Sequence, residues 1–155
     1  MVKIIMATLI NKEQQLTDID IDSFEKLFVN KIPTSFKTHY KANNGGTPSE
    51  SDMEKGLWGL PICGFYSIKY GKLKIENTIT DIEFIDPEEK KYGTWAEYEF
   101  LPFAYDSGGN PIFLSLREED YGHIYLYAPD GKNIFSISDD FEDFLKRLYQ
   151  PQLSE

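Results

Sequence analysis

The amino-acid sequence predicts a single α+β domain, with a central, mostly antiparallel sheet packed against N-terminal and C-terminal helices. Apolar residues alternate with other residues between 111 and 138, which predicts consecutive strands joined by tight turns. Apolar residues at helical spacing near both ends of the chain predict the flanking helices. The chain has 155 residues, 41% of them hydrophobic, and is long enough to bury a core without metals or disulfides.

No internal repeat, linker or low-complexity segment divides the chain. Residues 19–150 are expected to form the domain, residues 1–18 an extension that belongs to it, and residues 151–155 a tail. The apolar run at 2–10 is short and leads directly into polar residues without a cleavage site, so we do not read it as a signal peptide. No run approaches the roughly 20 apolar residues that span a bilayer. A cytoplasmic location is the expectation.

The first helix is expected at residues 23–30. Asp22 and Glu25 have the spacing of a capping box, while the polar residues 11–22 before them are left unassigned. The apolar residues that would share its buried face are Phe24, Leu27 and Phe28.

A second helix is expected to begin at Pro33, which suits the first helical position. Gly45 and Gly46 follow it and would supply a left-handed cap. The residues predicted to share its apolar face are Ile32, Phe36 and Tyr40.

The middle of the chain is less regular. Residues 47–56 are predicted to be a polar loop, and alternation at 66–70 predicts a strand that Gly71 ends. Residues 73–85 fit either a helix or a strand, and we favour the helix. Residues 86–94 are charged and punctuated by Gly and Pro, which predicts a loop.

The C-terminal third predicts a three-stranded antiparallel meander, with turns at 120–122 and 129–132. Its apolar face consists of Ile112, Leu114, Leu116, Ile124, Leu126, Phe135 and Ile137. The opposite face carries the rings of Phe113, Tyr125 and Tyr127. Those rings must be covered, either by the domain's own helices or by a partner.

An amphipathic helix is expected to close the domain. Asp139 and Glu142 have capping-box spacing, Lys146 and Arg147 suit the helix end, and Pro151 would stop it. Its apolar stripe is Phe141, Phe144, Leu145 and Leu148.

The charge balance narrows the possible partners. The chain has 26 acidic and 16 basic side chains, for a formal charge of −10. This balance disfavours nucleic acid and anionic membranes, and it favours a basic protein partner. Solubility alone would also explain it. Aromatic residues make up 15% of the chain, so some rings should reach the surface as interface anchors.

The sequence offers no constellation for catalysis, a metal or a cofactor. His39 and His123 are the only histidines, and we expect ordinary surface or half-buried side chains there. The single Cys63 excludes an internal disulfide and a cysteine zinc site, and it is expected to be a small buried residue. Residues 106–110 superficially resemble the start of a calcium-binding loop. The twelfth position of an EF-hand loop, counted from Asp106, requires glutamate but is Arg117 here, so the match fails.

Five segments, taken in order, resemble the SUKH superfamily, the Smi/Knr-like group. They are residues 32–40 (IPTSFKTHY) running into Asn44-Gly45-Gly46, residues 101–110 (LPFAYDSGGN), the strand at 111–116, the strand entry at 121–125 (YGHIY), and the final helix at 138–145 (SDDFEDFL). Together they span most of the chain between 19 and 149.

This resemblance implies an α+β domain that binds and neutralises a cognate polymorphic toxin, often a nuclease or another cytoplasm-acting effector. It implies no catalytic residue, and Phe141, Phe144 and Leu145 would dock the last helix. The residues that it implies to be structural are Pro33, Asn44, Gly45, Gly46, Pro102, Gly108, Gly109 and Asn110.

The leading hypothesis is therefore an immunity, antitoxin-like protein that occludes a basic toxin surface and is not an enzyme. The candidate partner-binding rings are Trp58, Tyr66, Tyr105, Tyr125 and Tyr127, and the candidate charges are Asp106, Glu118, Glu119 and Asp120. The alternatives are a regulatory scaffold of the same fold without a toxin partner and, more remotely, a hydrolase that acts through carboxylates. The oligomeric state, monomer or homodimer, is left open.

Overall fold

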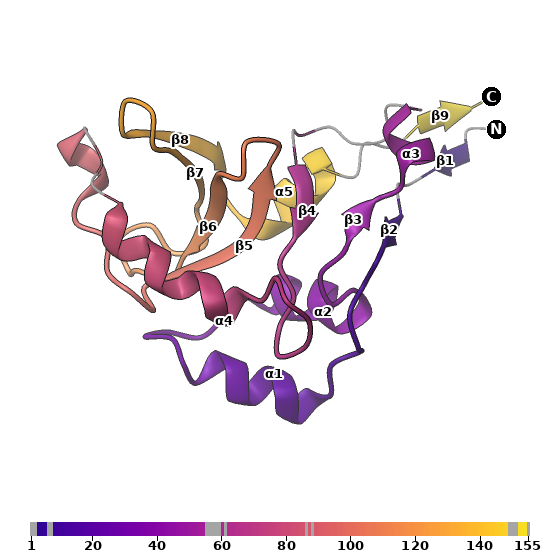
Figure 1. Cartoon of the computed structure of the whole chain (residues 1–155), viewed down its shortest axis with the longest axis horizontal. Helices are drawn as coiled ribbons and strands as arrows, with labels where there is room; N and C mark the ends of the chain where they lie inside the picture. The colour runs from indigo at the N-terminus through magenta and orange to yellow at the C-terminus, as the bar shows by residue number, and fades with distance from the viewer. Residues whose placement is uncertain are drawn as a thin grey trace.

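A five-stranded antiparallel sheet forms the centre of the molecule, in a computed structural model that describes residues 3–5, 8–54, 60, 62–85, 87, 89–148 and 152–154. The strands are neighbours in the order in which they occur in the chain (Figure 1). Their bounds are β4 (Ile62–Phe65), β5 (Phe100–Asp106), β6 (Pro111–Ser115), β7 (Ile124–Ala128) and β8 (Asn133–Ser138). The predicted α+β class and its antiparallel sheet are confirmed.

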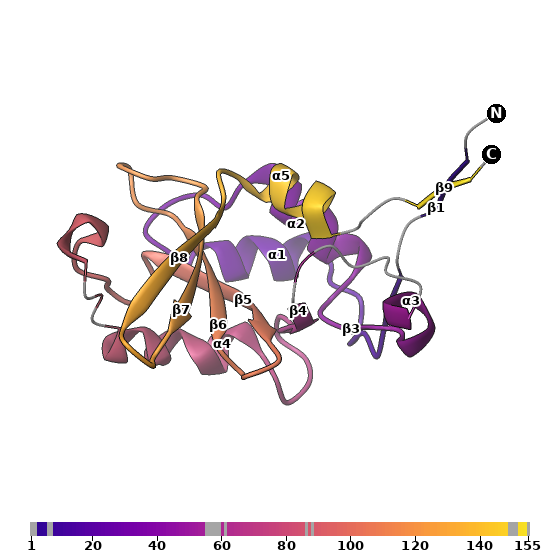
Figure 2. The ribbon, with the colours of Figure 1, turned by 90° about the horizontal axis from the view of Figure 1, so that it is seen from above.

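Helices cover both faces of this sheet (Figure 2). On one face lie α1 (Asp18–Glu25), α2 (Thr34–Ala42) and α5 (Phe141–Leu148). On the other lie α4 (Ile75–Thr78) and the 3-10 helix η1 (Ile79–Phe84), and a second 3-10 helix, η2 (Lys90–Tyr92), lies farther along the chain. Within the described residues, no helix combines the length and apolar character that crossing a membrane requires.

A hydrophobic core consequently lies on each face of the sheet. The larger core packs α1, α2 and α5 against the face that carries Phe103, Leu114 and Ile124. The smaller core surrounds Phe113 on the opposite face, and its other members are Ile82, Ile85, Trp95, Phe100, Tyr125, Tyr127 and Ile134. The domain's own segment from 79 to 95 therefore helps to cover the rings of Phe113, Tyr125 and Tyr127.

Five short elements lie outside the five-stranded sheet. Strand β2 (Leu9–Ile10) pairs with β3 (Thr47–Pro48), and β1 (Lys3–Ile5) pairs with β9 (Gln152–Ser154). Helix α3 (Glu50–Glu54) follows β3. The predicted loop at 47–56 was therefore wrong for its described part, residues 47–54.

The first helix begins earlier than the predicted residues 23–30. Thr17 caps α1: its hydroxyl accepts from the backbone N–H of Asp20 (3.1 Å), and the Asp20 carboxylate accepts from that of Thr17 (2.9 Å). This capping box prevails over the one predicted for Asp22 and Glu25, because Glu25 instead accepts from the backbone N–H of Ile32 (2.9 Å).

The C-terminal helix agrees with its predicted stripe but not with its predicted cap. Asp140, not Asp139, accepts from the backbone N–H three residues on, that of Asp143 (2.7 Å). Phe141, Phe144 and Leu148 are buried, and Leu145 packs against them partly buried.

The strand predicted at 66–70 was wrong, because β4 ends at Phe65 and a loop follows it. Ile68 cannot join a strand there, since the Asn44 side chain binds both its N–H (2.7 Å) and its carbonyl oxygen (2.9 Å). Residues 73–85 are helical through α4 and η1, as favoured. The predicted loop at 86–94 contains η2.

The predicted meander is confirmed with one exception. Phe135 lies on the face of its register partner Leu126, yet it is 49% exposed because β8 is an edge strand of the sheet. The predicted turn at 129–132 connects β7 to β8, with a bond from the Lys132 N–H to the Pro129 carbonyl (3.0 Å).

Helix α2 agrees with prediction in its buried face but not in its end. Ile32, Phe36 and Tyr40 are almost fully buried, and Pro33 directly precedes the first helical residue. The helix ends at Ala42 and its cap residue is Asn43, whose backbone is extended, so no glycine forms the cap. The positive φ angles fall later, at Gly45 and Gly46.

We expect Tyr40→Phe to lower the free energy of unfolding by about 1–2 kcal/mol. The buried Tyr40 hydroxyl lies within hydrogen-bond distance of the carbonyl oxygens of Tyr66 (2.7 Å) and Phe103 (3.0 Å), and the change leaves the Tyr66 oxygen without this donor. Urea denaturation measures the effect. Tyr127→Phe is the control, since the Tyr127 phenol makes no hydrogen bond with the described part of the chain. Equal losses in the two variants would contradict the prediction.

Candidate functional site: the Tyr105 hollow

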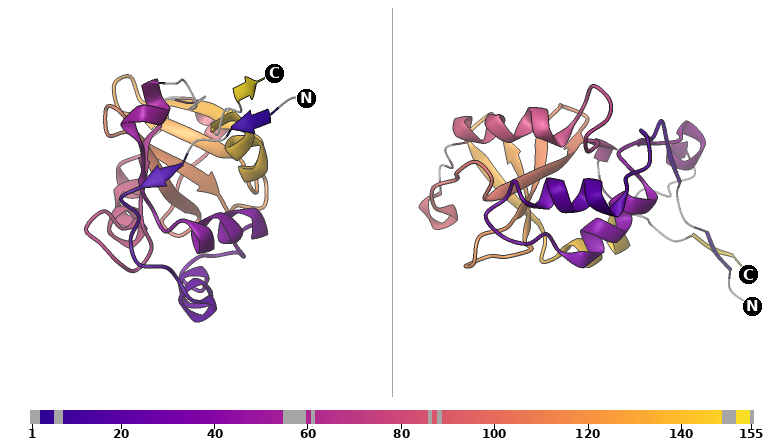
Figure 3. Two further views of the ribbon diagram at one scale, coloured as in Figure 1. Left: turned by 90° about the vertical axis from the view of Figure 1, so that its right-hand side faces the viewer. Right: turned by 90° about the horizontal axis from the view of Figure 1, so that it is seen from below.

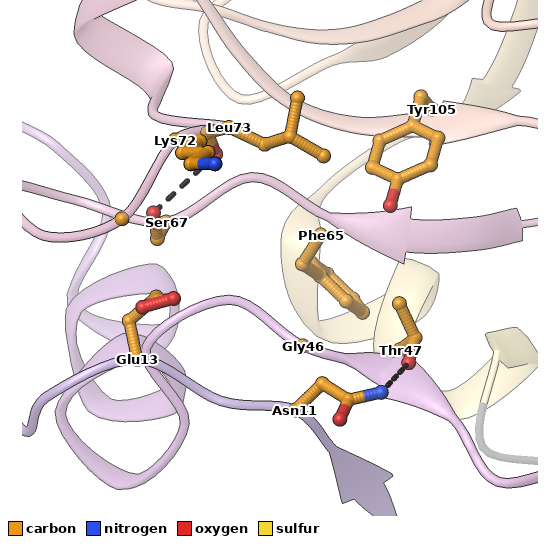
Figure 4. Close-up of a pocket in the computed structure, with 10 residues that line it drawn as sticks. Asn11, Glu13, Gly46, Thr47, Phe65, Ser67, Lys72, Leu73 and Tyr105 are labelled. Carbon is orange, nitrogen blue, oxygen red and sulfur yellow. Dashed lines mark hydrogen bonds between the residues drawn. The ribbon is translucent and has the colours of Figure 1, made fainter.

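A hollow of about 500 Å³ opens at the β4 edge of the sheet. Its walls come from the N-terminal segment, the turn after α2, β4, the loop between β4 and α4, and the end of β5 (Figure 4). We call it the Tyr105 hollow. Its lining residues are Asn11, Glu13, Gly46, Thr47, Phe65, Ser67, Gly71, Lys72, Leu73 and Tyr105.

Gly64 allows the Tyr105 ring to lie across β4. The two residues are register partners on β4 and β5, and a Cβ atom on residue 64 would lie 2.4 Å from the Tyr105 hydroxyl. The Tyr105 ring also packs against Tyr66, with centroids 5.1 Å apart. A glycine in a strand thus marks a close side-chain approach.

The opposite wall depends on the Asn44-Gly45-Gly46 turn. Gly46 lies against the N-terminal segment, where a Cβ would be 2.9 Å from the Ile10 carbonyl oxygen. Its own carbonyl accepts from the Phe65 N–H (2.8 Å), so the turn joins this segment to β4. At the rim, the Asn11 amide donates to the Thr47 hydroxyl (3.2 Å).

The Asn44 side chain ties three segments together. Its amide nitrogen donates to the carbonyls of Gln14 and Ile68 (both 2.9 Å), and its oxygen accepts from the Ile68 N–H (2.7 Å). The residue is 3% exposed. It therefore fixes the N-terminal segment and the β4–α4 loop relative to α2, and with them two walls of the hollow.

The Asn-Gly-Gly turn after α2, the β5–β6 pair and the C-terminal helix occur in the order that the sequence resemblance implies. The SMI1/KNR4 family model (SUKH-1) matches residues 15–147. The chain belongs to this SUKH-1 family. No curated protein matches it.

Both phenols beside the hollow of this SUKH-1 chain stay protonated at neutral pH. Burial raises the pKa of Tyr66 to about 12, and the negative charges of Asp81 and Asp106 add to the effect. Burial also raises the pKa of Tyr105. Neither hydroxyl makes a hydrogen bond within the described residues. Tyr105 lines the hollow and is available to a partner, whereas Tyr66 is 9% exposed and supports the Tyr105 ring from the core.

Asp106 lies near these phenols, but its own loop occupies its carboxylate. The carboxylate accepts from the backbone N–H groups of Gly108 and Asn110 (both 2.9 Å) and from the Asn110 side chain (3.0 Å). These donors give Asp106, Gly108 and Asn110 a structural role. The described residues include no group of histidine, cysteine and acidic side chains arranged to hold a metal.

The other predicted charges lie elsewhere, at the β6–β7 turn. Asp120 is half-buried and binds Arg117 Nε (3.1 Å) and the Tyr125 hydroxyl (2.7 Å). Glu118 and Glu119 are exposed beside it and line another hollow, with Val29 and Glu99. This turn contributes no residue to the Tyr105 hollow.

Of the predicted rings, Tyr66 and Tyr105 lie together. Tyr125 and Tyr127 belong to the smaller core and are 6% and 7% exposed, so they offer little surface to a partner. Trp58 lies outside the described residues.

His39 and Cys63 differ from expectation. His39 is buried in α2 among the rings of Tyr40, Phe65 and Phe141, and Cys63 is half-buried on β4. His123 is half-buried, as expected, and its Nε2 lies 2.6 Å from the Ser136 hydroxyl.

Sequence reasoning missed most of the lining. Asn11, Glu13 and Thr47 lie in segments without clear periodicity, and Leu73 was placed in an ambiguous stretch. The one local signal was Gly64, whose lack of a side chain marks a close approach.

Proposed function

We propose that this SUKH-1 chain is an immunity protein that binds and neutralises a cognate polymorphic toxin. The family match over residues 15–147 carries the proposal, because this family is abundant among bacterial immunity proteins. Family membership also supports a protein-binding role over catalysis, since its members are generally not enzymes.

The Tyr105 hollow is the surface that we propose for the toxin. Phe65, Leu73 and the Tyr105 ring supply its apolar lining, and Asn11, Glu13, Thr47 and Lys72 supply polar side chains beside them (Figure 4). An apolar, aromatic centre within a polar rim is the typical anatomy of an interface that concentrates binding energy. The formal charge of −10 favours a toxin whose contacting surface is basic.

Co-expression tests the proposal. The chain is produced in a bacterium together with the toxin encoded beside its gene, and growth is compared with that of cells that make the toxin alone. We expect growth to be restored in proportion to the amount of the chain. Growth arrest that persists at an excess of soluble chain would refute the immunity role. A gene without any toxin neighbour would favour the regulatory scaffold.

We expect Tyr105→Ala to weaken toxin binding by at least about 30-fold, the effect of losing a hot-spot aromatic of about 2 kcal/mol or more. Calorimetric titration with a catalytically inactive toxin measures the affinity, and thermal unfolding checks that the variant is folded. The matched control is Phe135→Ala, which removes a half-exposed ring from β8, at the other edge of the sheet. A larger loss of toxin affinity for Phe135→Ala than for Tyr105→Ala would contradict the hollow as the toxin-binding surface.

A further inference from the structure

A second depression, of about 290 Å³, lies between α1 and the loop that precedes α4. Figures 1 and 3 show this loop beside α1. We call the depression the Glu76 groove. Its lining residues are Ile19, Asp20, Ser23, Phe24, Leu27, Ile68, Lys69 and Glu76.

The helix side of the groove presents apolar side chains that the core does not use. Ile19 and Ser23 are four residues apart on α1 and so project on the same side, while Ile21 and Phe24 fill the core. Leu27 follows in the turn after the helix and also lines the groove. Ile19 is 76% exposed, and Leu27, predicted to be a core residue, is 46% exposed. Two large aliphatic side chains thus border the groove without cover.

The opposite side, formed by this loop and the start of α4, contains a buried carboxylate oxygen without a donor among the described residues. Glu76 Oε2 accepts from the backbone N–H of Lys69 (2.7 Å). Glu76 Oε1 is buried and accepts no hydrogen bond from the described residues. Such an atom destabilises the folded state if nothing satisfies it, and buried acceptors in native proteins nearly always have a donor.

The nearby cation is already engaged. Lys69 Nζ binds Asp20 Oδ1 at 2.6 Å. Asp20, Lys69 and Glu76 are the ionisable residues of the lining, so it holds two carboxylates and one ammonium. One further positive charge would balance the groove.

We propose that the Glu76 groove binds an arginine side chain presented by a protein partner. Its alkyl stem would lie against Ile19 and Leu27, and its guanidinium would donate to the Glu76 carboxylate, with Oε1 turning from its covered position into the groove. Arginine suits the site because it combines an apolar stem with a planar group of five N–H donors that is weakly hydrated for a cation.

The groove and the Tyr105 hollow adjoin the same loop. Ser67, Gly71, Lys72 and Leu73 of this loop line the hollow, whereas Ile68 and Lys69 of the loop, with Glu76 of α4, line the groove. The proposal rests on the proposed function only in that the toxin would supply the arginine.

The test uses n-butylguanidinium, a mimic of the arginine side chain, and follows the backbone amides of the full chain by NMR. We expect saturable shifts at Ile19, Ser23 and Lys69, with a dissociation constant of roughly 1–10 mM for so small a ligand. Glu76→Gln should weaken binding about tenfold or more, because a charge-assisted hydrogen bond is lost. Ile19→Ser should weaken it as well, and its exposed position makes misfolding no concern.

Glu142→Gln is the matched control, since Glu142 is an exposed carboxylate on α5 that lines neither the groove nor the Tyr105 hollow. It should leave the affinity unchanged. Shifts confined to the Tyr105 hollow, no saturable shifts, or equal affinities for Glu76→Gln and the unaltered chain would each overturn the proposal.

Co-expression with the toxin separates this proposal from the proposed function. If the chain binds n-butylguanidinium in the groove but fails to protect cells, the groove proposal is supported and the immunity role is refuted. If the chain protects cells but gives none of the expected shifts, the immunity role is supported and the groove proposal is refuted.

Discussion

Replacing Asn44 with alanine is expected to lower the free energy of unfolding by about 3 kcal/mol. The change removes three hydrogen bonds from a side chain that is 3% exposed. The Ile68 carbonyl keeps a bond from the Tyr70 N–H (2.7 Å), but the Ile68 N–H and the Gln14 carbonyl lose the partners that Asn44 supplied. Each buried group left without a partner costs about 1–3 kcal/mol. Urea denaturation at pH 7 measures the difference.

Asn43→Ala is the matched control for this substitution. Asn43 is the adjacent residue of the same type, it is half-buried, and its side chain accepts from Lys12 Nζ at 3.3 Å. A loss below about 1 kcal/mol is expected there, because bonds near the surface are readily replaced by water. If Asn43→Ala lowered the free energy of unfolding as much as Asn44→Ala, the three hydrogen bonds of the Asn44 side chain would not account for its effect.

The sequence predicted a turn at the Asn-Gly-Gly segment but not the hydrogen bonds by which Asn44 joins other segments. Glycines after a helical stretch predict a left-handed cap, and Gly45 and Gly46 do have positive φ angles. Their close approach to Ser67 and Ile10 follows from Asn44, which draws the N-terminal segment and the β4–α4 loop together. A side chain that joins three distant segments leaves no periodic trace in the sequence.

Elements that are determined by residues close together in the sequence were predicted correctly, and elements that depend on tertiary contacts were not. The β6–β8 meander was predictable because alternation and turn residues both act over a few positions. Helix α1 was misplaced because two capping-box spacings overlap, and tertiary contact drew Glu25 to Ile32. Strand β4 was missed because Gly64 interrupts its apolar pattern where Tyr105 crosses it.

The candidate site was only partly predictable for the same reason. Its lining spans residues 11 to 105, and the sequence pointed to Tyr66 and Tyr105 only as aromatic residues. Aromatic content could not distinguish them from Tyr125 and Tyr127, because the segment that includes η1 and Trp95 helps to bury the latter pair. Which face of a sheet remains open depends on how a weakly periodic segment folds back.

Lowering the pH from 6.5 to 4 is expected to reduce the free energy of unfolding by up to about 3 kcal/mol through His39 alone. Burial lowers the pKa of His39 from 6.5 to about 4, because a charged imidazole would be poorly solvated among the surrounding rings. Between these pH values the unfolded chain binds a proton that the folded chain does not. Stability is therefore fully present above pH 6.5 and is lost as the pH falls towards 4.

His39→Gln isolates this effect, because glutamine does not titrate. The stability difference between the two proteins, measured by urea denaturation from pH 7.5 to 4, should change by up to about 3 kcal/mol across the window. Asp120 acts mainly at lower pH: although burial raises it, hydrogen bonds from Arg117, Ser115 and Tyr125 hold the pKa of this carboxyl below its usual 3.8. Carboxylates that titrate near pH 4 contribute equally to both proteins and cancel in the difference. A loss of equal steepness in both proteins between pH 6.5 and 4 would assign the acid sensitivity to other groups.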